Sequence, residues 1–193
     1  MSQERFKSLK EMQNEVDADK GGTVNPKELL RLELLTSFEK YTKAMFKAQY
    51  HRSFIVAEHH KKMFSALQDV VDGNCKRLII NIAPRYGKTE LVIKSFISWC
   101  FALNPKCRFL HLSYSDILVN DNSDTIRSIM MEQLYTTLFP QSALASEKGS
   151  AKRWKTKAGG ELYAVSTQGQ VTGFGAGNVD IDPELDKMDG GNN

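Results

Sequence analysis

Residues 77–91 have the sequence RLIINIAPRYGKTEL, in which a short apolar run is followed by a loop and then by a helical pattern. A nearly continuous apolar run of this length is typical of a strand that is buried on both faces, as in a parallel sheet. We therefore predict a strand over residues 77–82, a loop over residues 83–87 and a helix over residues 88–103. In this arrangement the backbone N–H groups at the start of the helix can bind an anion.

The predicted loop contains the residue types that bind nucleotide phosphates. Gly87 lets the backbone approach a phosphate closely, Lys88 can reach the β- and γ-phosphates, and the Thr89 hydroxyl can bind Mg²⁺. Ile82 stands where the common GxxxxGK[ST] pattern has its first glycine. The alternative interpretation is a chance Gly-Lys-Thr tripeptide, but the strand–loop–helix setting favours nucleotide binding.

The hydrophobic periodicity of the remaining chain predicts an α/β fold. The further expected elements are helices over residues 3–16, 27–48, 55–71 and 117–138 and strands over residues 108–114 and 161–166. Strands that alternate with helices indicate a largely parallel sheet with flanking helices. The helices before residue 77 would form an N-terminal cap or subdomain.

The composition is that of an ordinary globular protein, with 193 residues, 41% hydrophobic and 25% charged, and a net charge of +3. These values exclude a collagen-like, coiled-coil or wholly disordered chain. Three cysteines without a CxxC pair favour a reducing compartment and argue against a zinc site. No apolar run reaches the roughly 18 residues that a membrane span needs, and the N-terminus is too polar for a signal peptide. We expect a soluble, cytoplasmic protein.

Residues 77–91 resemble the Walker A region of tailed-phage terminase large subunits, in which Pro-Pro-Arg-x-Gly-Lys-Ser/Thr often replaces the glycine-first loop. Three other stretches agree with that family in order and spacing: His59-His60 before the loop, LHLSYS at 110–115, and YAVSTQGQVTGFGAG at 163–177. The last stretch resembles the segment that precedes the Walker B strand of the family. The resemblance covers residues 36–178 and implies a P-loop NTPase fold.

The resemblance implies a motor that hydrolyses ATP, with Mg²⁺, to drive double-stranded DNA into the capsid of a phage or prophage. The implied nucleotide-binding residues are Pro84, Arg85, Tyr86, Gly87, Lys88 and Thr89. Lys88 and Arg85 would be the catalytic cations that meet the charge on the transferred phosphoryl group. A structural ion pair is the alternative role for Arg85. The implied partners are a terminase small subunit, a capsid portal and further copies of the chain in a ring, in the host cytoplasm.

The segment that contains Gln49 lies where an adenine-reading element of the family falls, although a surface position explains this glutamine equally well. A P-loop ATPase also needs an apolar strand that ends in two carboxylates. The chain has Val179-Asp180-Ile181-Asp182-Pro183 after its Gly-rich segment, so Asp180 and Asp182 are candidate Mg²⁺ ligands. Because Asp180 interrupts the apolar run, we interpret this segment as an insertion and expect the Walker B strand, and the nuclease domain of the family, beyond Asn193.

These patterns divide the chain into three parts. We expect a helix–loop–helix segment over residues 1–35, an incomplete ATPase domain over residues 36–178, and an acidic loop or tail over residues 179–193. As a hypothesis, the chain binds ATP weakly and hydrolyses it little or not at all. The alternatives are a non-catalytic nucleotide-binding fragment, an inert remnant, and a helicase-like P-loop ATPase, which the segments after the loop argue against.

Residues 17–28 fit the twelve-residue loop of an EF-hand. Asp17, Asp19, Thr23 and Glu28 occupy ligand positions, so Ca²⁺ is a possible second cofactor. Gly21 stands at a position that usually supplies a side-chain oxygen. The alternative interpretation is a polar turn between two helices, with Glu28 in the first turn of the second.

A basic segment near residue 154 combines cations with an aromatic ring. Lys152, Arg153 and Lys155 are candidates for binding DNA phosphates, and Trp154 could stack on a base. The alternative is a solvated hairpin that turns at Gly159-Gly160, with Trp154 partly buried.

Overall fold

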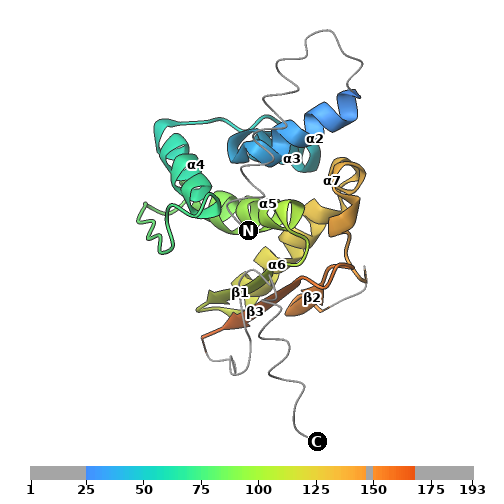
Figure 1. Ribbon diagram of the computed structural model, residues 1–193. Coiled ribbons are helices and arrows are strands. Elements are labelled where there is room, and N and C mark those ends of the chain that lie inside the picture. The colour runs from blue at the N-terminus through green and yellow to red at the C-terminus, as the bar shows by residue number, and fades with distance from the viewer. Residues whose placement is uncertain (1–24, 147–149, 168–193) are drawn as a thin grey trace, which may run out of the picture.

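The computed structural model describes residues 25–146 and 150–167 of the chain. In this part, a group of helices lies against a small sheet (Figure 1). The elements in chain order are α2 (Pro26–Thr36), α3 (Phe38–Tyr50), α4 (Glu58–Val71), the π-helix η1 (Thr89–Ser95), α5 (Phe96–Leu103), β1 (Arg108–Ser113), α6 (Asp116–Met131), α7 (Gln133–Leu138), the 3₁₀ helix η2 (Pro140–Ser142), β2 (Arg153–Lys155) and β3 (Glu161–Ser166). The described chain is therefore an α/β protein, as predicted.

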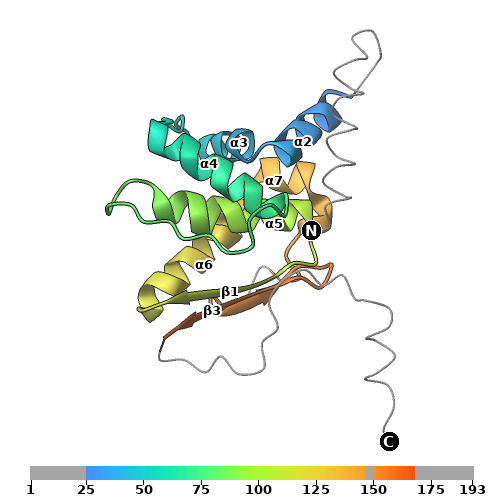
Figure 2. The same ribbon diagram turned by 60° about the vertical axis from the view of Figure 1, so that its left-hand side comes forward.

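The sheet has the strand order β1-β3-β2 and lies beneath the helices (Figure 2). β1 and β3 run parallel, with Arg108 opposite Glu161 and Ser113 opposite Ser166. β2 runs antiparallel to β3 and forms a hairpin with it. The predicted strands over residues 108–114 and 161–166 are confirmed. The sheet is mixed rather than largely parallel, because the short hairpin places β2 directly beside β3.

The core lies around α5, which is almost entirely apolar and is buried from Ile97 to Leu103. A helix that is apolar on all sides belongs in an interior. The Trp99 ring is fully buried, lies 5.1 Å from the Phe38 ring between centroids, and donates its indole N–H to the Leu34 carbonyl at 2.9 Å. Tyr41 donates to the Ser98 hydroxyl at 2.8 Å. These bonds satisfy the polar atoms of the buried aromatic side chains and join α2, α3 and α5.

Three predicted helices differ from the structure in their bounds or continuity, and the helix expected over residues 3–16 lies outside the described residues. The helix expected over 27–48 is two helices, because the Ser37 side chain accepts from the Lys40 N–H and so begins α3. The helix expected over 55–71 begins at Glu58, and the helix expected over 117–138 is broken at Glu132. No helix in the described ranges is long and apolar enough to cross a membrane.

The predicted strand over residues 77–82 is wrong, because the structure has no strand there. A parallel strand needs a neighbour for its backbone hydrogen bonds, and none of the three strands of the described chain pairs with this segment. Ile80 and Ile82 pack against the core, whereas Ile79 is 93% exposed. The helix expected over 88–103 is confirmed, and its first seven residues form η1.

Candidate functional site

The loop over residues 83–88 has a strained backbone. Arg85 has a φ of 68° and Gly87 a φ of 78°, so both are left-handed. This conformation is natural for glycine but costs another residue about 1–3 kcal/mol, and such strain clusters at functional sites. Lys88 is right-handed and begins the helix, where the Leu91 N–H donates to the Gly87 carbonyl at 3.0 Å. Alternation of left- and right-handed residues turns successive N–H groups into an anion-binding concavity.

The first turn of α4 supports this loop. The Nδ1 atom of His60 accepts the Ala57 N–H at 3.0 Å, and its ring also forms a hydrogen bond with the Tyr86 backbone. Gly87 passes so close that a Cβ there would lie 2.9 Å from His60 Nε2. The His59 ring lies close to two other rings. Its centroid is 3.9 Å from that of His60 and 5.3 Å from that of Tyr86.

The surroundings of His60 favour the neutral form of its imidazole. Burial lowers the pKa of His60 below its ordinary value, and the neighbouring His59 lowers it further. Hydrogen bonds with the Tyr86 and Ile55 backbone act in the opposite direction. The Nε2 atom of His59 is buried and has no hydrogen-bond partner within the described chain.

A cavity of about 480 Å³ opens on one side of the loop, between the loop, the end of α3, residues 52–55 and the start of α4. Its walls combine two cations with aromatic rings, as in Arg52, Phe54, Arg85 and Tyr86. The Arg52 guanidinium lies 5.6 Å from the centre of the Phe46 ring. Gln49 lies in the last turn of α3 and is partly buried, but it is outside the lining of this cavity.

A second cavity, of about 440 Å³, lies on another side of the loop. Residues 76–80 form one wall, η1 and α5 form the floor, and Phe109 of β1 closes it. Lys88 and Thr89 line this cavity, whereas Arg85 and Gly87 line the first. The structure thus brings the predicted loop residues together, with Arg85, Lys88 and Thr89 all exposed. None of these three side chains forms an ion pair or a hydrogen bond with another described residue.

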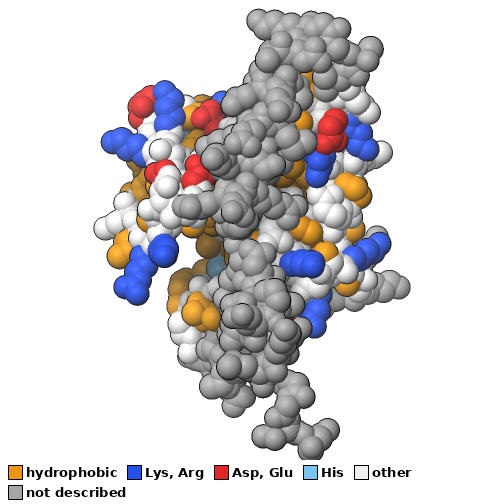
Figure 3. Space-filling view, viewed as in Figure 1, with side chains coloured by type: hydrophobic (Ala, Val, Ile, Leu, Met, Phe, Trp, Pro, Cys, Tyr) orange, Lys and Arg blue, Asp and Glu red, His pale blue; other side chains and the backbone are white. Residues whose placement is uncertain are grey.

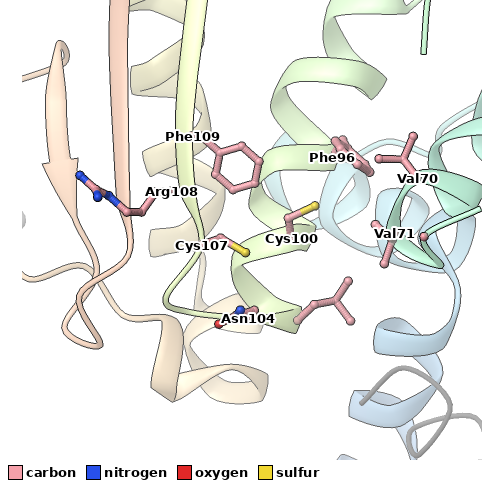
Figure 4. A pocket seen from close by; sticks show the side chains of 10 residues that line it. Val70, Val71, Phe96, Cys100, Asn104, Cys107, Arg108 and Phe109 are labelled. Atoms are coloured by element: carbon pink, nitrogen blue, oxygen red, sulfur yellow. The ribbon is translucent and has the colours of Figure 1, made fainter. Parts of the chain in front are cut away.

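A third cavity, of about 300 Å³, continues from the second toward the end of α5, and sequence reasoning missed it (Figure 4). Cys100 and Cys107 line it, together with apolar side chains from α4 and β1. Burial raises the pKa of the Cys100 thiol well above its ordinary value, so this thiol is protonated and unreactive near neutral pH. No spacing signal could have found the cavity, because it arises from the packing of three separate elements.

The candidate calcium ligands Asp17, Asp19 and Thr23 lie outside the described residues. Glu28 lies in the first turn of α2, where its carboxylate pairs with Arg31 at 2.8 Å. Within the described ranges, no group of three or more His, Cys, Asp and Glu side chains could hold a metal ion. The candidate magnesium ligands Asp180 and Asp182 also lie outside these ranges.

The basic hairpin is built as a structural element. Trp154 is 5% exposed and donates its indole N–H to the Ser123 hydroxyl at 2.8 Å, so its ring belongs to the core. The Arg153 guanidinium pairs with Glu161, which also accepts from Arg108 at 3.2 Å. Burial opposes ionisation of Glu161, but the two arginines outweigh it and hold the pKa of the carboxyl below its ordinary value.

Lys152 and Lys155 are exposed and remain candidates for binding DNA phosphates. Figure 3 shows Lys and Arg side chains on both flanks of the molecule, with Asp and Glu side chains among those on the upper part.

The chain matches no protein-family model, no curated protein and no solved structure.

Proposed function

We propose that the chain binds the phosphates of ATP in the loop over residues 83–89. The observation that carries this proposal is the exposed loop with left-handed residues at Arg85 and Gly87, which leads directly into the helix η1 and carries cations that pair with no other described residue. Converging N–H groups, a helix N-terminus and free cations together make a site for a polyphosphate. Backbone strain such as that at Arg85 clusters at ligand and active sites, which supports the proposal.

The roles of the loop residues follow from their positions. Lys88 contacts the β- and γ-phosphates, Thr89 binds Mg²⁺, and Arg85 stabilises charge on the γ-phosphate. The base and ribose occupy the cavity of about 480 Å³ beside Arg85, where aromatic and cationic walls suit a stacked base. Arg52 and Tyr86 therefore replace Gln49 as the residues that meet the base.

The wider proposal is that the chain is the ATPase part of a DNA-packaging motor, with a P-loop NTPase fold. Its support is the ordered resemblance of residues 36–178 to terminase large subunits. Double-stranded DNA, a small terminase subunit, a capsid portal and a ring of identical subunits are the partners that follow from this proposal. Glu90 is the carboxylate of the first cavity, and it pairs with Lys94 at 3.1 Å. We infer that the catalytic carboxylates lie outside the described residues, where Asp180 and Asp182 are the candidates.

The test is to titrate the full chain with a fluorescent ATP analogue in Mg²⁺ buffer, and to repeat the titration with the Lys88→Ala variant. Loss of a charge-assisted hydrogen bond weakens binding by about 10- to 100-fold. Lys106→Ala is the matched control, because Lys106 is equally exposed but lies in the turn between α5 and β1. Equal affinities of the wild type and Lys88→Ala, or no binding at all, would overturn the proposal.

Measurement of ATP hydrolysis distinguishes a motor from a module that only binds the nucleotide. Steady ATP hydrolysis that is lost in Lys88→Ala and in Asp182→Asn would place the catalytic carboxylate in this chain. Binding without hydrolysis by the wild type would support nucleotide binding and contradict catalysis by the chain alone. Stimulation of hydrolysis by double-stranded DNA would favour the packaging motor.

A further inference from the structure

We propose that His60 is the positioning residue of the phosphate loop, which its neutral imidazole ties to α4 through the Tyr86 carbonyl. This inference rests on the proposed function in one respect, because an effect of His60 on nucleotide affinity requires that the loop binds ATP. The structural claim itself concerns the loop without nucleotide, so it can be tested separately.

The orientation of the His60 ring is fixed by α4 itself. Ala57 precedes the helix and has no polar side chain that could cap it, and the His60 Nδ1 atom accepts the Ala57 N–H instead, at 3.0 Å. A neutral imidazole that accepts at Nδ1 carries its proton on Nε2. The Nε2 atom faces the loop, where a Cβ on Gly87 would lie 2.9 Å away. The Nε2–H group is therefore the donor to the Tyr86 carbonyl.

The loop has few other fixed points. In the described part of the chain, residues 78–86 have no strand partner, and their regular structure is limited to a turn at residues 84–85. Tyr86 is 52% exposed and Arg85 is strained, so packing does not determine their conformation. The hydrogen bond to the Tyr86 carbonyl, between two left-handed residues, is therefore one of the few contacts that set the direction of the N–H groups that follow it.

The surroundings of His60 favour the uncharged ring through burial and the neighbouring His59, whereas the hydrogen bonds with the Tyr86 and Ile55 backbone favour the charged ring. His59 lies beside it from the same helix, and Arg85, Tyr86, Arg52 and Glu90 line the same cavity. A proton on Nδ1 would point at the Ala57 N–H, so the cap would be lost. We therefore expect acid to weaken the hold of His60 on the loop through the loss of this cap.

The test compares His60→Gln with His60→Glu in the full chain. Both side chains have an oxygen that accepts the Ala57 N–H, as Glu and Gln do at the third position of many helices. The amide of Gln also has an N–H donor for the Tyr86 carbonyl, whereas the carboxylate of Glu has none. Both variants therefore keep the helix cap, and they differ in the hydrogen bond to the Tyr86 carbonyl. Lys62→Gln is the control, because Lys62 is exposed on the same helix.

The first measurement is amide hydrogen exchange of Leu91 without nucleotide, because the Leu91 N–H donates to the Gly87 carbonyl at 3.0 Å and so reports on the conformation of the loop. We expect wild-type rates in His60→Gln and Lys62→Gln, and exchange about tenfold faster in His60→Glu, which is the effect of one lost hydrogen bond. Equal exchange in the Gln and Glu variants would overturn the inference and leave His60 as a helix cap only.

The second measurement is affinity for the fluorescent ATP analogue between pH 8 and pH 5.5. Wild type should lose affinity relative to His60→Gln below the ordinary histidine pKa of 6.5, because the Gln side chain does not titrate. A constant ratio of the two affinities across this range would contradict the role of the neutral ring. If the wild type binds no nucleotide while the exchange difference remains, the proposed function fails and the positioning of the loop by His60 stands.

Discussion

The segment over residues 77–88 and the helix that follows it are continuous in sequence but are held by different means. Every residue of α5 is buried or nearly so, and Trp99 has both ring contacts and a hydrogen bond. Residues 77–88 are mostly exposed, and their backbone is left without strand partners in the described chain. One part is fixed by many redundant contacts, and the other by a few contacts with α4.

This difference explains why the loop can be a site. Regions with few buried contacts open at low free energy, and binding segments come from them while a rigid scaffold positions them. The N-terminal end of η1 is anchored by α5 behind it, so Lys88 projects from a fixed base. A substitution in α5 should therefore change the stability of the whole chain, whereas one in the loop should mainly change binding.

The largest effect is expected for Trp99→Ala. Removing a fully buried indole from the core costs about 3–5 kcal/mol, and this change also leaves the Leu34 carbonyl without its donor. The measurement is the free energy of unfolding from urea denaturation. A cost below about 1 kcal/mol would show that the packing around α5 is not the main support of the fold.

A smaller effect is expected for Gly87→Ala, with Gly159→Ala as its matched control. Both glycines have positive φ, 78° and 95°, so alanine adds backbone strain of about 1–2 kcal/mol at each. A Cβ at residue 159 meets nothing within 4 Å, whereas one at residue 87 meets His60. Gly87→Ala should therefore destabilise the chain more and also lose affinity for ATP. Equal unfolding free energies and equal affinities in the two variants would contradict the contact with His60.

The third prediction concerns the pH dependence of the stability of the fold. The pKa of Glu161 is lower in the folded chain than its ordinary 4.5, so its ion pairs stabilise the fold fully above that pH. This contribution is lost as the pH falls through the folded pKa. Glu161→Gln should cost about 1–3 kcal/mol at pH 7 and should flatten the fall of the melting temperature between pH 5 and pH 3. Parallel melting curves of the variant and the wild type would show that Arg108 and Arg153 do not hold this carboxylate.

The smallest effect is expected for Ile79→Ala. Because Ile79 is 93% exposed, the change should alter the unfolding free energy by no more than about 0.5 kcal/mol. A loss of about 2 kcal/mol, measured by urea denaturation, would mean that residues 77–82 are buried in solution by something beyond the described residues.

The helix over residues 88–103 and the strands over 108–113 and 161–166 could be predicted because local pattern and tertiary setting agree there. The strand over residues 77–82 could not, because an apolar run shows only that a segment prefers burial. Whether it becomes a strand depends on a neighbour that local sequence does not reveal. The break at Ser37 has a capping signal, but the apolar periodicity on both sides conceals it.

Only part of the candidate site could be predicted from the sequence. The loop residues 84–89 were found from their types and order, and the structure places them in one exposed turn. The contact of His60 with Gly87 joins two segments that are distant in sequence, so no periodicity could indicate it. The separation of Arg85 from Lys88 and Thr89 into two cavities is likewise a result of backbone direction, which the residue types do not determine.

In the described chain, β1 pairs with β3 on one side only. The second cavity lies between β1 and residues 76–80, and Lys88 and Thr89 are among its walls. A strand that pairs with the open side of β1 would therefore also cover these two residues. Binding at the sheet edge and binding at the phosphate loop would then be thermodynamically linked, and each would change the affinity of the other by the same factor.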